Sequence, residues 1–420
     1  MMKNNVVITA VSAITPLGND LNIIQNCLKS GQSGIRHITR YDMSGFPVRH
    51  GGECDLSLLE SFKYPFSGNI QFKLFFYTIS NLINQMNGEY LPRQTGIFVG
   101  LDPNLACIND FNHLYKCYDL LNNEQRLFDW NNLNQKEIFN ADPSLLFYYA
   151  AKMFNINGPC IGNLGTCSAS TQSIGTAYTM IKNGQIQKAI AGGVSSKVDP
   201  ISITRLSRLD ALETTKDDIS ENCRPFDKNR NGFTISEGAV LFALESEESA
   251  KKRNAKIFAE IKGYGSALDG FSITAPHEEA LGMTLSMNRA LNDAGIDSRS
   301  IDYLNAHGTA TLKNDLFETM AIKNVFAQND VLSISSTKSM HGHLMTAAGA
   351  MEALVCILAM SENYIPPTIN YRTPDPLCDL DYTPNVMKKK NINCCMSNSF
   401  GLGGQNATLI FSKYEKERTW

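Results

Sequence analysis

The chain places one cysteine inside a run of very small residues, "GTCSAST", at positions 165–171. The residues from Gly158 to Gly162 are typical of a strand and those after the run are typical of a helix, so Cys167 lies where a strand gives way to a helix. A cysteine in this position has two interpretations. It is a packed core residue, as free cysteines commonly are, or the helix start lowers the pKa of its thiol and makes it a nucleophile, a thiolate.

A histidine and two turns could take part in the same chemistry. "NAHGTATLKNDLFE" (305–318) puts His307 at the end of an apolar strand, although such a histidine is often only a hydrogen-bonded structural residue. "MSNSFGLGGQNATLIF" (396–411) is a glycine-dense turn that runs into a strand rather than a helix, so it matches no phosphate-binding or dinucleotide-binding loop. "RPFDKNRNGFTISEGA" (224–239) is a turn-rich link between strands.

The segment "STKSMHGHLMTAAGAMEAL" (336–354) contains the other polar candidates. It places Lys338, His341 and His343 at a strand-to-helix junction, with Glu352 further along the helix. Lysine before a helix is often a solvated charge. Two histidines two residues apart would not point together at a helix start, and no aspartate or cysteine ligand lies nearby, so we expect no metal site.

Taken together, these residues indicate a reaction. A cysteine at a helix start with two separate histidines is suited to acyl transfer followed by carbanion chemistry: the cysteine forms a thioester. Imidazole donors such as His307 and His343 then stabilise an enolate oxygen, and backbone N–H groups at the glycine turn form an oxyanion hole.

The elements that must position these residues alternate between buried strands and helices, which predicts an α/β architecture. Helices are predicted over 167–182, 279–294 and 316–327. Residues 158–184 and 330–360 repeat the order of strand, small-residue turn and helix, which suggests two related halves. The predicted strands span residues 4–11, 95–100, 188–194, 239–245, 256–265, 301–308, 331–338 and 407–411.

The two halves would divide near the charged segment 245–256, giving domains of 1–250 and 251–420. Residues 101–145 show no regular period and are interpreted as a loop-and-helix excursion at the surface or at a subunit contact.

Composition limits the class of protein. The chain has 420 residues, of which 43% are hydrophobic and 19% charged, as in a soluble globular protein with a large core. A net charge of −3 gives no reason to expect nucleic acid or an anionic membrane as a partner. Eleven cysteines without a C-x-x-C pair predict reduced thiols in the cytoplasm. The apolar N-terminus is interpreted as a first strand rather than a signal peptide, and no uncharged run reaches the ~18 residues of a membrane span.

The motifs resemble the β-ketoacyl-acyl carrier protein synthases of the I/II type. The glycine turn, the Lys338 segment and "NAHGTATLKNDLFE" are similar to that family's signatures, as are "RPFDKNRNGFTISEGA" and the N-terminal "VVITAVSAITPLGND". The resemblance is strong over residues 1–60 and 158–412 and poor over 61–157. It implies a thiolase-like fold, five-layered αβαβα and built from two related halves.

The resemblance also implies an activity: a decarboxylating Claisen condensation of an acyl thioester with malonyl-acyl carrier protein, in fatty acid or polyketide/polyene-type biosynthesis. Its partners would be the carrier protein and a second ketosynthase subunit, in a homodimer or a heterodimer. No cofactor would be needed beyond the phosphopantetheine of the carrier and a possible structural monovalent cation.

Site roles follow position by position. Cys167 would be the nucleophile, while His307 and His343 would stabilise the enolate. Lys338 and Glu352 would hold the histidine network in charge and geometry. The backbone N–H groups of Cys167 and Phe400 would form the oxyanion hole, and Phe400 would gate the acyl pocket. Substrate would contact Thr274, Thr309, Thr311 and Gly401, the three threonines along the pantetheine tunnel. The cation would lie among Asn305, Glu352, Ser397 and Asn398.

The chain departs from the family pattern at several places. Thr166 stands where many relatives have Ala, Leu402 replaces a common Phe in the gating loop, and Gln405 replaces a common Thr. Residues 64–77, where the family usually has a basic carrier-docking helix, contain few positive charges, so the carrier would dock differently or with a partner's help.

Other interpretations compete with a catalytic synthase. A chain-length-factor-like subunit, the non-catalytic half of a heterodimer, usually lacks the nucleophile. A degradative thiolase uses a second cysteine in the C-terminal glycine turn, which reads "SFGLGG" here. A type III synthase would pair one histidine with an asparagine. A papain-like hydrolase is disfavoured by the repeated α/β unit around Cys167 and has no need of Lys338.

Overall fold

The computed structural model describes residues 4–60, 62, 70–86, 95–103, 142–214 and 222–415, and the backbone of the antiparallel pair β5 (Tyr118–Leu121) and β6 (Gln125–Phe128). Most of the irregular stretch 101–145 therefore lies outside the described residues, and so does the first part of 64–77.

Five strands form the sheet of the first half of the chain. Their order across the sheet is β7-β4-β8-β9-β1, in which β4 runs parallel to both β7 and β8 while β9 is antiparallel to β8 and β1. The apolar, β-branched runs predicted from the sequence account for these strands because both faces of the sheet are covered. Their bounds are β1 (Val6–Ile14), β4 (Gly96–Gly100), β7 (Cys160–Asn163), β8 (Lys188–Ser195) and β9 (Gly238–Ser246).

The second half repeats this arrangement. The order is β12-β11-β15-β16-β10, and each pair has the same parallel or antiparallel sense as its counterpart in the first half. The two sheets join where Val6–Ile8 pairs with 259–261. The expected two related halves are thus present in the topology. The bounds are β10 (Ala259–Leu268), β11 (Tyr303–Asn305), β12 (Ser333–Ser335), β15 (Cys394–Gly401) and β16 (Gln405–Ser412).

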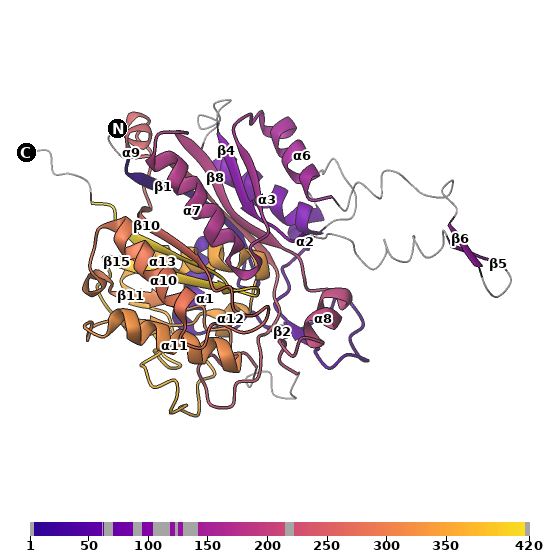
Figure 1. Ribbon diagram of the computed structural model, residues 1–420. Coiled ribbons are helices and arrows are strands. Elements are labelled where there is room, and N and C mark those ends of the chain that lie inside the picture. Colours follow the sequence, from indigo (N-terminus) through magenta and orange to yellow (C-terminus); the bar gives the residue numbers. More distant parts are fainter. Residues whose placement is uncertain are drawn as a thin grey trace, which may run out of the picture.

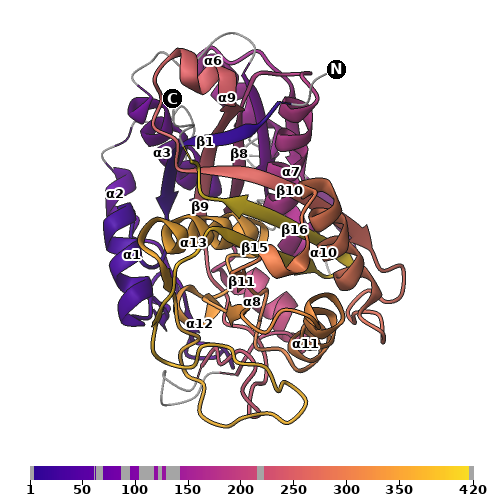
Figure 2. The same cartoon turned by 90° about the vertical axis from the view of Figure 1, so that its left-hand side faces the viewer.

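The helices and sheets stack in five layers, as expected. The central layer is α7 (Ala169–Lys182) and α13 (Ala348–Glu362), which contact each other and strands of both sheets. Figures 1 and 2 show α3 (Ile70–Gln85) and α6 (Ser144–Phe154) on one outer side and α10 (Leu281–Ala294) and α11 (Leu312–Phe326) on the opposite side. The central helices are rich in small residues because they are sandwiched: a Cβ on Gly175 or Gly349 would collide with Tyr264 or Thr171.

The two central helices begin alike, which confirms the internal repeat. A short 3₁₀ turn, η2 (Thr166–Ser168), leads into α7, and η5 (Met345–Ala347) leads into α13. The first residue of each turn has a left-handed backbone, with φ of 50° at Thr166 and 49° at Met345. The charged segment expected to link the halves is not an open linker, because residues 247–252 form a helix, α9 (Glu247–Lys252), capped by Ser246.

Two helix expectations need adjustment. The helix predicted over 316–327 begins earlier, at Leu312, because the Thr311 side chain accepts a hydrogen bond from the backbone N–H of Asn314 and caps it. The part of 64–77 that the structure describes belongs to α3, whose largely buried side chains pack on β1 and β9, so its apolar composition reflects the core.

The other described elements are short. They are α1 (Leu21–Ser30), β2 (Arg36–His37), β3 (His50–Gly51), α2 (Ser57–Glu60), α8 (Pro200–Ser207), η4 (Ser298–Ser300), α12 (Lys338–His341), β13 (Tyr364–Ile365) and β14 (Lys388–Lys389). Among the described residues one stretch, Met345–Glu362, has the length and apolar composition to cross a membrane, but most of it is buried inside the protein, as the core helix of a soluble protein would be.

Candidate active site

Cys167 is the second residue of η2 and lies almost fully buried, at 6% exposure. It borders a cavity of about 430 Å³ that opens to the surface at the largely exposed Ile273. The tight turn that contains it, residues 165–168, closes through hydrogen bonds from the backbone N–H and the hydroxyl of Ser168 to the carbonyl of Gly165. The small neighbours predicted from the sequence thus place the thiol at the inner end of an access route.

Two histidines meet Cys167 at this cavity. His307 follows the end of β11 and His343 lies between α12 and η5. The Sγ atom and one ring nitrogen of each histidine all lie within 4.8 Å of one another. The two imidazole rings are 5.4 Å apart between centroids and nearly perpendicular, at 88°. The structure therefore brings together the three residues that the sequence predicted as the reactive set.

Lys338 fixes the proton of His307. Its Nζ atom lies 3.2 Å from Nδ1 of His307 and forms a buried ion pair with Glu352. An ammonium group can only donate, so Nδ1 accepts and the ring proton resides on Nε2. Burial, together with the charge of Lys338, holds the pKa of His307 well below its usual value, so the ring is neutral.

A backbone amide does the same for His343. The N–H of Met345 donates to Nδ1 of His343 over 3.0 Å, which again leaves the proton on Nε2. The main chain of His343 is held between the carbonyl of Thr234 and the N–H of Ser236. Burial holds the pKa of His343 well below its usual value. Both histidines are therefore neutral with an N–H donor at Nε2.

This proton arrangement argues against a metal among Cys167, His307 and His343. A metal-binding histidine normally donates its second ring N–H to an acceptor, which frees the other nitrogen for the metal. Here both Nδ1 atoms face donors, so the Nε2 atoms carry protons. His341, the other histidine of the segment, is turned away: its ring nitrogens bond the Gly342 carbonyl and Thr337 hydroxyl.

The loop that carries His307 is held by two carboxylates of α11. The oxygens of Glu318 accept hydrogen bonds from the backbone N–H groups of His307 (2.8 Å) and Gly308 (2.7 Å). One turn earlier, Asp315 accepts from the N–H of Ala310. All of these groups are buried, so the backbone beside His307 has little freedom.

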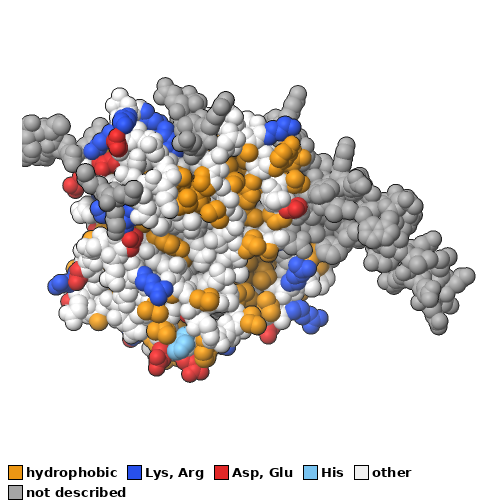
Figure 3. Space-filling model, turned by 45° about the horizontal axis from the view of Figure 1, so that its top comes forward, with side chains coloured by type: hydrophobic (Ala, Val, Ile, Leu, Met, Phe, Trp, Pro, Cys, Tyr) orange, Lys and Arg blue, Asp and Glu red, His pale blue; other side chains and the backbone are white. Residues whose placement is uncertain are grey.

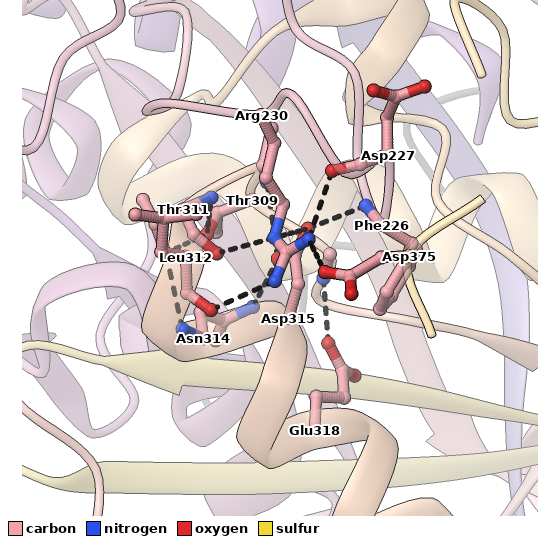
Figure 4. Close-up of polar contacts among 12 residues, drawn as sticks. Phe226, Asp227, Arg230, Thr309, Thr311, Leu312, Asn314, Asp315, Glu318 and Asp375 are labelled. Atoms are coloured by element: carbon pink, nitrogen blue, oxygen red, sulfur yellow. Dashed lines mark hydrogen bonds and ion pairs between the residues drawn. The ribbon is translucent and has the colours of Figure 1, made fainter. Parts of the chain in front are cut away.

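Arg230 completes this support (Figure 4). Its guanidinium donates to the carbonyls of Thr311 and Leu312, bonds the carboxylate of Asp375 and pairs with Asp315 at 3.7 Å. Arg230, in the turn-rich segment 224–239, therefore braces the part of the cavity wall formed by Thr311 and Leu312. Sequence reasoning missed Glu318, Asp315 and Arg230 as supporting residues, although all three lie in motifs that it singled out.

The protonation state of the Cys167 thiol differs from the one expected from the sequence. We expected the helix start to make Cys167 a thiolate, but burial raises the pKa of its thiol to about 11. The charge of Lys338 and the backbone N–H of Leu402 act in the opposite direction without overcoming burial. Cys167 is therefore a neutral thiol at rest, and a thiolate has to develop during the reaction.

The other residues predicted to contact substrate share one cavity. Thr274, Thr309, Thr311, Phe400 and Gly401 all border the same cavity as Cys167. Lys338 and Glu352 lie behind the histidines, fully buried and away from the cavity. The lining also includes residues that were not predicted: Leu209, Phe233, Ile273, Leu312, Lys313, Asn314 and Met345.

The predicted cation position can be tested by asking whether its oxygen atoms are free to bind an ion. Oδ1 of Asn305, Oε2 of Glu352 and Oγ of Ser397 are buried without a hydrogen-bond partner. Asn305 and Ser397 are partners in the register of β11 and β15, and α13 packs on both strands. Three orphaned oxygens fit a hard cation. Asn398 does not join them, because both ends of its side chain are hydrogen-bonded elsewhere.

A five-layered fold of two related halves, with a cysteine at the start of a central helix and two histidines on its cavity, defines the thiolase-fold condensing enzymes. Within them the chain belongs to the β-ketoacyl synthase family. The family's N-terminal domain matches residues 84–250 and its C-terminal domain matches 258–372.

Similar proteins match nearly the whole chain. It is 37% identical to 3-oxoacyl-[acyl-carrier-protein] synthase 2 of Coxiella burnetii, over 98% of this chain and 99% of that protein. The synthase 2 of Synechocystis sp. is 34% identical over the same shares. Among solved structures, the ishigamide ketosynthase/chain length factor has a TM-score of 0.87 and 30% identity, and covers 98% of this chain and 100% of that chain. A type II polyketide ketosynthase in complex with its acyl-carrier protein has a TM-score of 0.87 and 27% identity, with the same coverage.

Proposed function

We propose that the protein catalyses the condensation of an acyl group held on Cys167 with malonyl-acyl carrier protein, giving 3-oxoacyl-acyl carrier protein and CO₂. The observation that carries this proposal is the convergence of one thiol and two neutral Nε2–H donors on a single cavity. The synthase 2 relatives support the reaction class.

In the first half-reaction Cys167 takes the acyl group. Its sulfur attacks the thioester carbonyl of the acyl-carrier protein, the bond to the carrier sulfur breaks, and the thiol proton ends on the departing carrier thiol. Lys338 and the Leu402 N–H stabilise negative charge on Cys167 as the proton leaves. Backbone N–H groups of Cys167 and Phe400 are proposed to stabilise the oxyanion.

In the second half-reaction the malonyl group loses CO₂. The carbon–carbon bond to the carboxylate breaks, and the electron pair moves into an enolate whose oxygen receives hydrogen bonds from Nε2–H of His307 and His343. The enolate carbon attacks the acyl carbonyl, the new carbon–carbon bond forms, and the sulfur of Cys167 leaves. That sulfur takes a proton from solvent, which restores the resting thiol with its high pKa.

The substrates reach the site as thioesters on a carrier protein. Thr274, Thr309 and Thr311 border the cavity between Cys167 and the surface, and are proposed to contact the pantetheine arm. A solved neighbour is a ketosynthase in complex with an acyl-carrier protein, which supports this partner.

The free thiols of this chain favour a cytoplasmic location, since all nine cysteines that the structure describes are unpaired. The division of the chain at residue 250 remains a prediction.

A second ketosynthase subunit is the other proposed partner. Strand β7 is at the edge of the sheet, and it exposes Ile161 beside the exposed Leu164. Tyr148 and Met153 of α6 are also exposed. Figure 3, which brings the top of Figure 1 forward, shows hydrophobic side chains gathered on this face. An open edge strand with apolar side chains is suited to pairing with the same strand of a second copy or of a related subunit.

A monovalent cation is proposed at Asn305, Glu352 and Ser397, where it would bind the three buried oxygens that lack a hydrogen-bond partner, including the Glu352 oxygen that does not pair with Lys338. The test is thermal unfolding in potassium chloride and in choline chloride at equal ionic strength. Potassium should raise the Tm of the wild type and not that of Ser397→Ala. Equal Tm values for the wild type in the two salts would contradict the site.

The alternative function is that of a non-catalytic subunit of a heterodimer. The retained Cys167, His307, His343 and Lys338 argue against it, because a subunit without chemistry has no need of a locked proton network. One experiment separates the two: CO₂ release from malonyl-carrier protein, measured with and without prior acylation. A condensing enzyme releases CO₂ faster after acylation, and Cys167→Ala should abolish this dependence on the acyl group. No release above a blank, with or without a candidate partner subunit, would overturn the proposal.

A further inference from the structure

The glycine turn, residues 401–404, packs against the nucleophile turn, residues 165–168. The hydroxyl of Thr166 donates to the carbonyl of Leu402 over 3.2 Å. Gly401 lies so close to this hydroxyl that a Cβ at Gly401 would collide with it. The two turns that border Cys167 are thus in direct contact through Thr166.

A second contact joins the same two regions one residue beyond the glycine turn. The side-chain amide of Gln172, on the first turns of α7, donates to the Oε1 atom of Gln405 over 3.4 Å and to the hydroxyl of Ser168 over 3.1 Å. Asn163 donates to the other end of Gln172 and accepts from the N–H of Gly165. Thr166 and Gln405 therefore both take part in hydrogen bonds that join the region of the glycine turn to the start of α7.

On its outer side the glycine turn is held by two backbone bonds and one side-chain bond. The N–H of Gly403 donates to the carbonyl of Ile273, and the carbonyl of Gly404 accepts from the N–H of Asp269 and from the side-chain amide of Asn406. Gly403 and Gly404 have φ values of 80° and 75°, which glycine adopts without strain, so the turn can change its backbone readily. Its position therefore depends on the few contacts that its neighbours make with it.

The contacts of the glycine turn matter because the turn borders the cavity at the Cys167 thiol. Phe400 and Leu402 border the cavity beside Cys167, and the same 430 Å³ extends outward to Ile273 and Lys313. A cavity of that volume is near the lower end for a site that holds a drug-sized ligand. If the pantetheine arm occupies this cavity, as the proposed function requires, a long acyl chain has room only when Phe400 and Leu402 move.

We infer that Thr166 and Gln405 latch the glycine turn against the nucleophile turn, and thereby set how readily acyl chains of increasing length load onto Cys167. The inference rests on the proposed acylation of Cys167. Thr166 and Gln405 act as positioning residues: they touch the turn and not the reacting atoms. A short acyl group loads with the latch closed, whereas a long chain loads only after the bonds from Thr166 and Gln172 break.

Matched variants test the latch. Thr166→Val removes the hydroxyl but keeps the β-branched side chain, so it holds the cost of the left-handed φ constant. Thr166→Ser keeps the hydroxyl. Gln405→Thr removes the second contact, the hydrogen bond from the side-chain amide of Gln172 to Gln405. The measurement is the rate of Cys167 acylation by carrier proteins bearing four-carbon and twelve-carbon chains, followed by intact mass, with alkylation by iodoacetamide as a check on the thiol itself.

The ratio of the twelve-carbon to the four-carbon rate should rise about threefold to tenfold in Thr166→Val and Gln405→Thr, the effect of losing one ordinary hydrogen bond. Thr166→Ser should keep the wild-type ratio, and alkylation should change less than twofold. An unchanged ratio in Thr166→Val, or an equal change in Thr166→Ser, would overturn the latch. If Thr166→Val does not fold, the ratio in Gln405→Thr decides. A wild type that accepts no acyl chain refutes the proposed function rather than the latch.

Discussion

The Nζ atom of Lys338 lies 3.2 Å from Nδ1 of His307 while the same ammonium is paired with Glu352 in a fully buried setting. This relationship decides which nitrogen of His307 carries the proton, and hence whether the cavity receives a hydrogen-bond donor. A cation that never enters the cavity thus controls the chemistry inside it.

Replacing Lys338 should therefore damage decarboxylation more than acylation. In the double variant Lys338→Met with Glu352→Gln, which avoids leaving a lone buried carboxylate, His307 loses its fixed tautomer. We expect CO₂ release to fall by about 100-fold or more, and acyl loading to fall much less. Because Lys338 lowers the pKa of His307, its removal also moves the acid limb of the pH profile to higher pH. Lys338→Arg is the control, and equal losses in both half-reactions would contradict this account.

The resting thiol predicts a characteristic pH dependence of alkylation. With a pKa of about 11, the thiolate fraction of Cys167 increases with pH throughout the range from pH 7 to 9. The iodoacetamide rate should therefore rise about tenfold per pH unit from pH 7 to 9. It is read at the peptide that contains Cys167, because Cys160 is exposed and would also react. A rate that levels off below pH 8 would instead indicate the thiolate expected from the helix start.

Glu318 should be a positioning residue for His307. Each of its oxygens accepts one backbone N–H, so the amide of Glu318→Gln leaves one of the two N–H groups facing another donor. An unpaired buried donor costs about 1–3 kcal/mol. We expect a lower Tm and roughly tenfold slower CO₂ release, with the KM for acyl-carrier protein little changed. Glu60→Gln, at an exposed glutamate, is the matched control. A wild-type rate in Glu318→Gln would show that the backbone bonds do not position His307.

The apolar face at β7 predicts an effect on assembly. Ile161→Glu places a carboxylate at the proposed subunit contact, where an unpaired charge is costly to bury. Its dimer dissociation constant should rise about 100-fold or more, as measured by light scattering across a dilution series. Leu377→Glu, at a side chain that is 66% exposed and far along the chain, should leave assembly intact. If both variants remain dimeric at low concentration, the contact lies elsewhere.

The sequence anticipated elements and reactive residues because both have local signals. Apolar β-branched runs coincide with strands, and Cys167 and His307 follow strand ends in motifs with characteristic small neighbours. The extent of α11 was missed because its first turn is polar, although Thr311 offered a capping signal. The relatives align over nearly the whole chain, so the weak resemblance over 61–157 reflects divergence within the same fold.

Properties that depend on packing between distant segments could not be predicted. The pKa of Cys167 follows from burial by several elements, whereas the sequence showed only the helix start. The bond from Thr166 to Leu402 joins residues 236 positions apart. Glu318 carried a partial signal, since it lies one turn after Asp315 in the His307 motif, but its contact with the His307 backbone depends on how α11 folds back.

The central claim is that Cys167 carries the acyl group during catalysis. Its most direct test is intact-mass spectrometry after incubation with an acyl-carrier protein, followed by addition of malonyl-carrier protein. The account predicts a mass gain equal to one acyl group in the wild type, its absence in Cys167→Ala, and its disappearance as 3-oxoacyl-carrier protein forms. An acyl adduct of equal size on Cys167→Ala, or product formed without any adduct on Cys167, would contradict it.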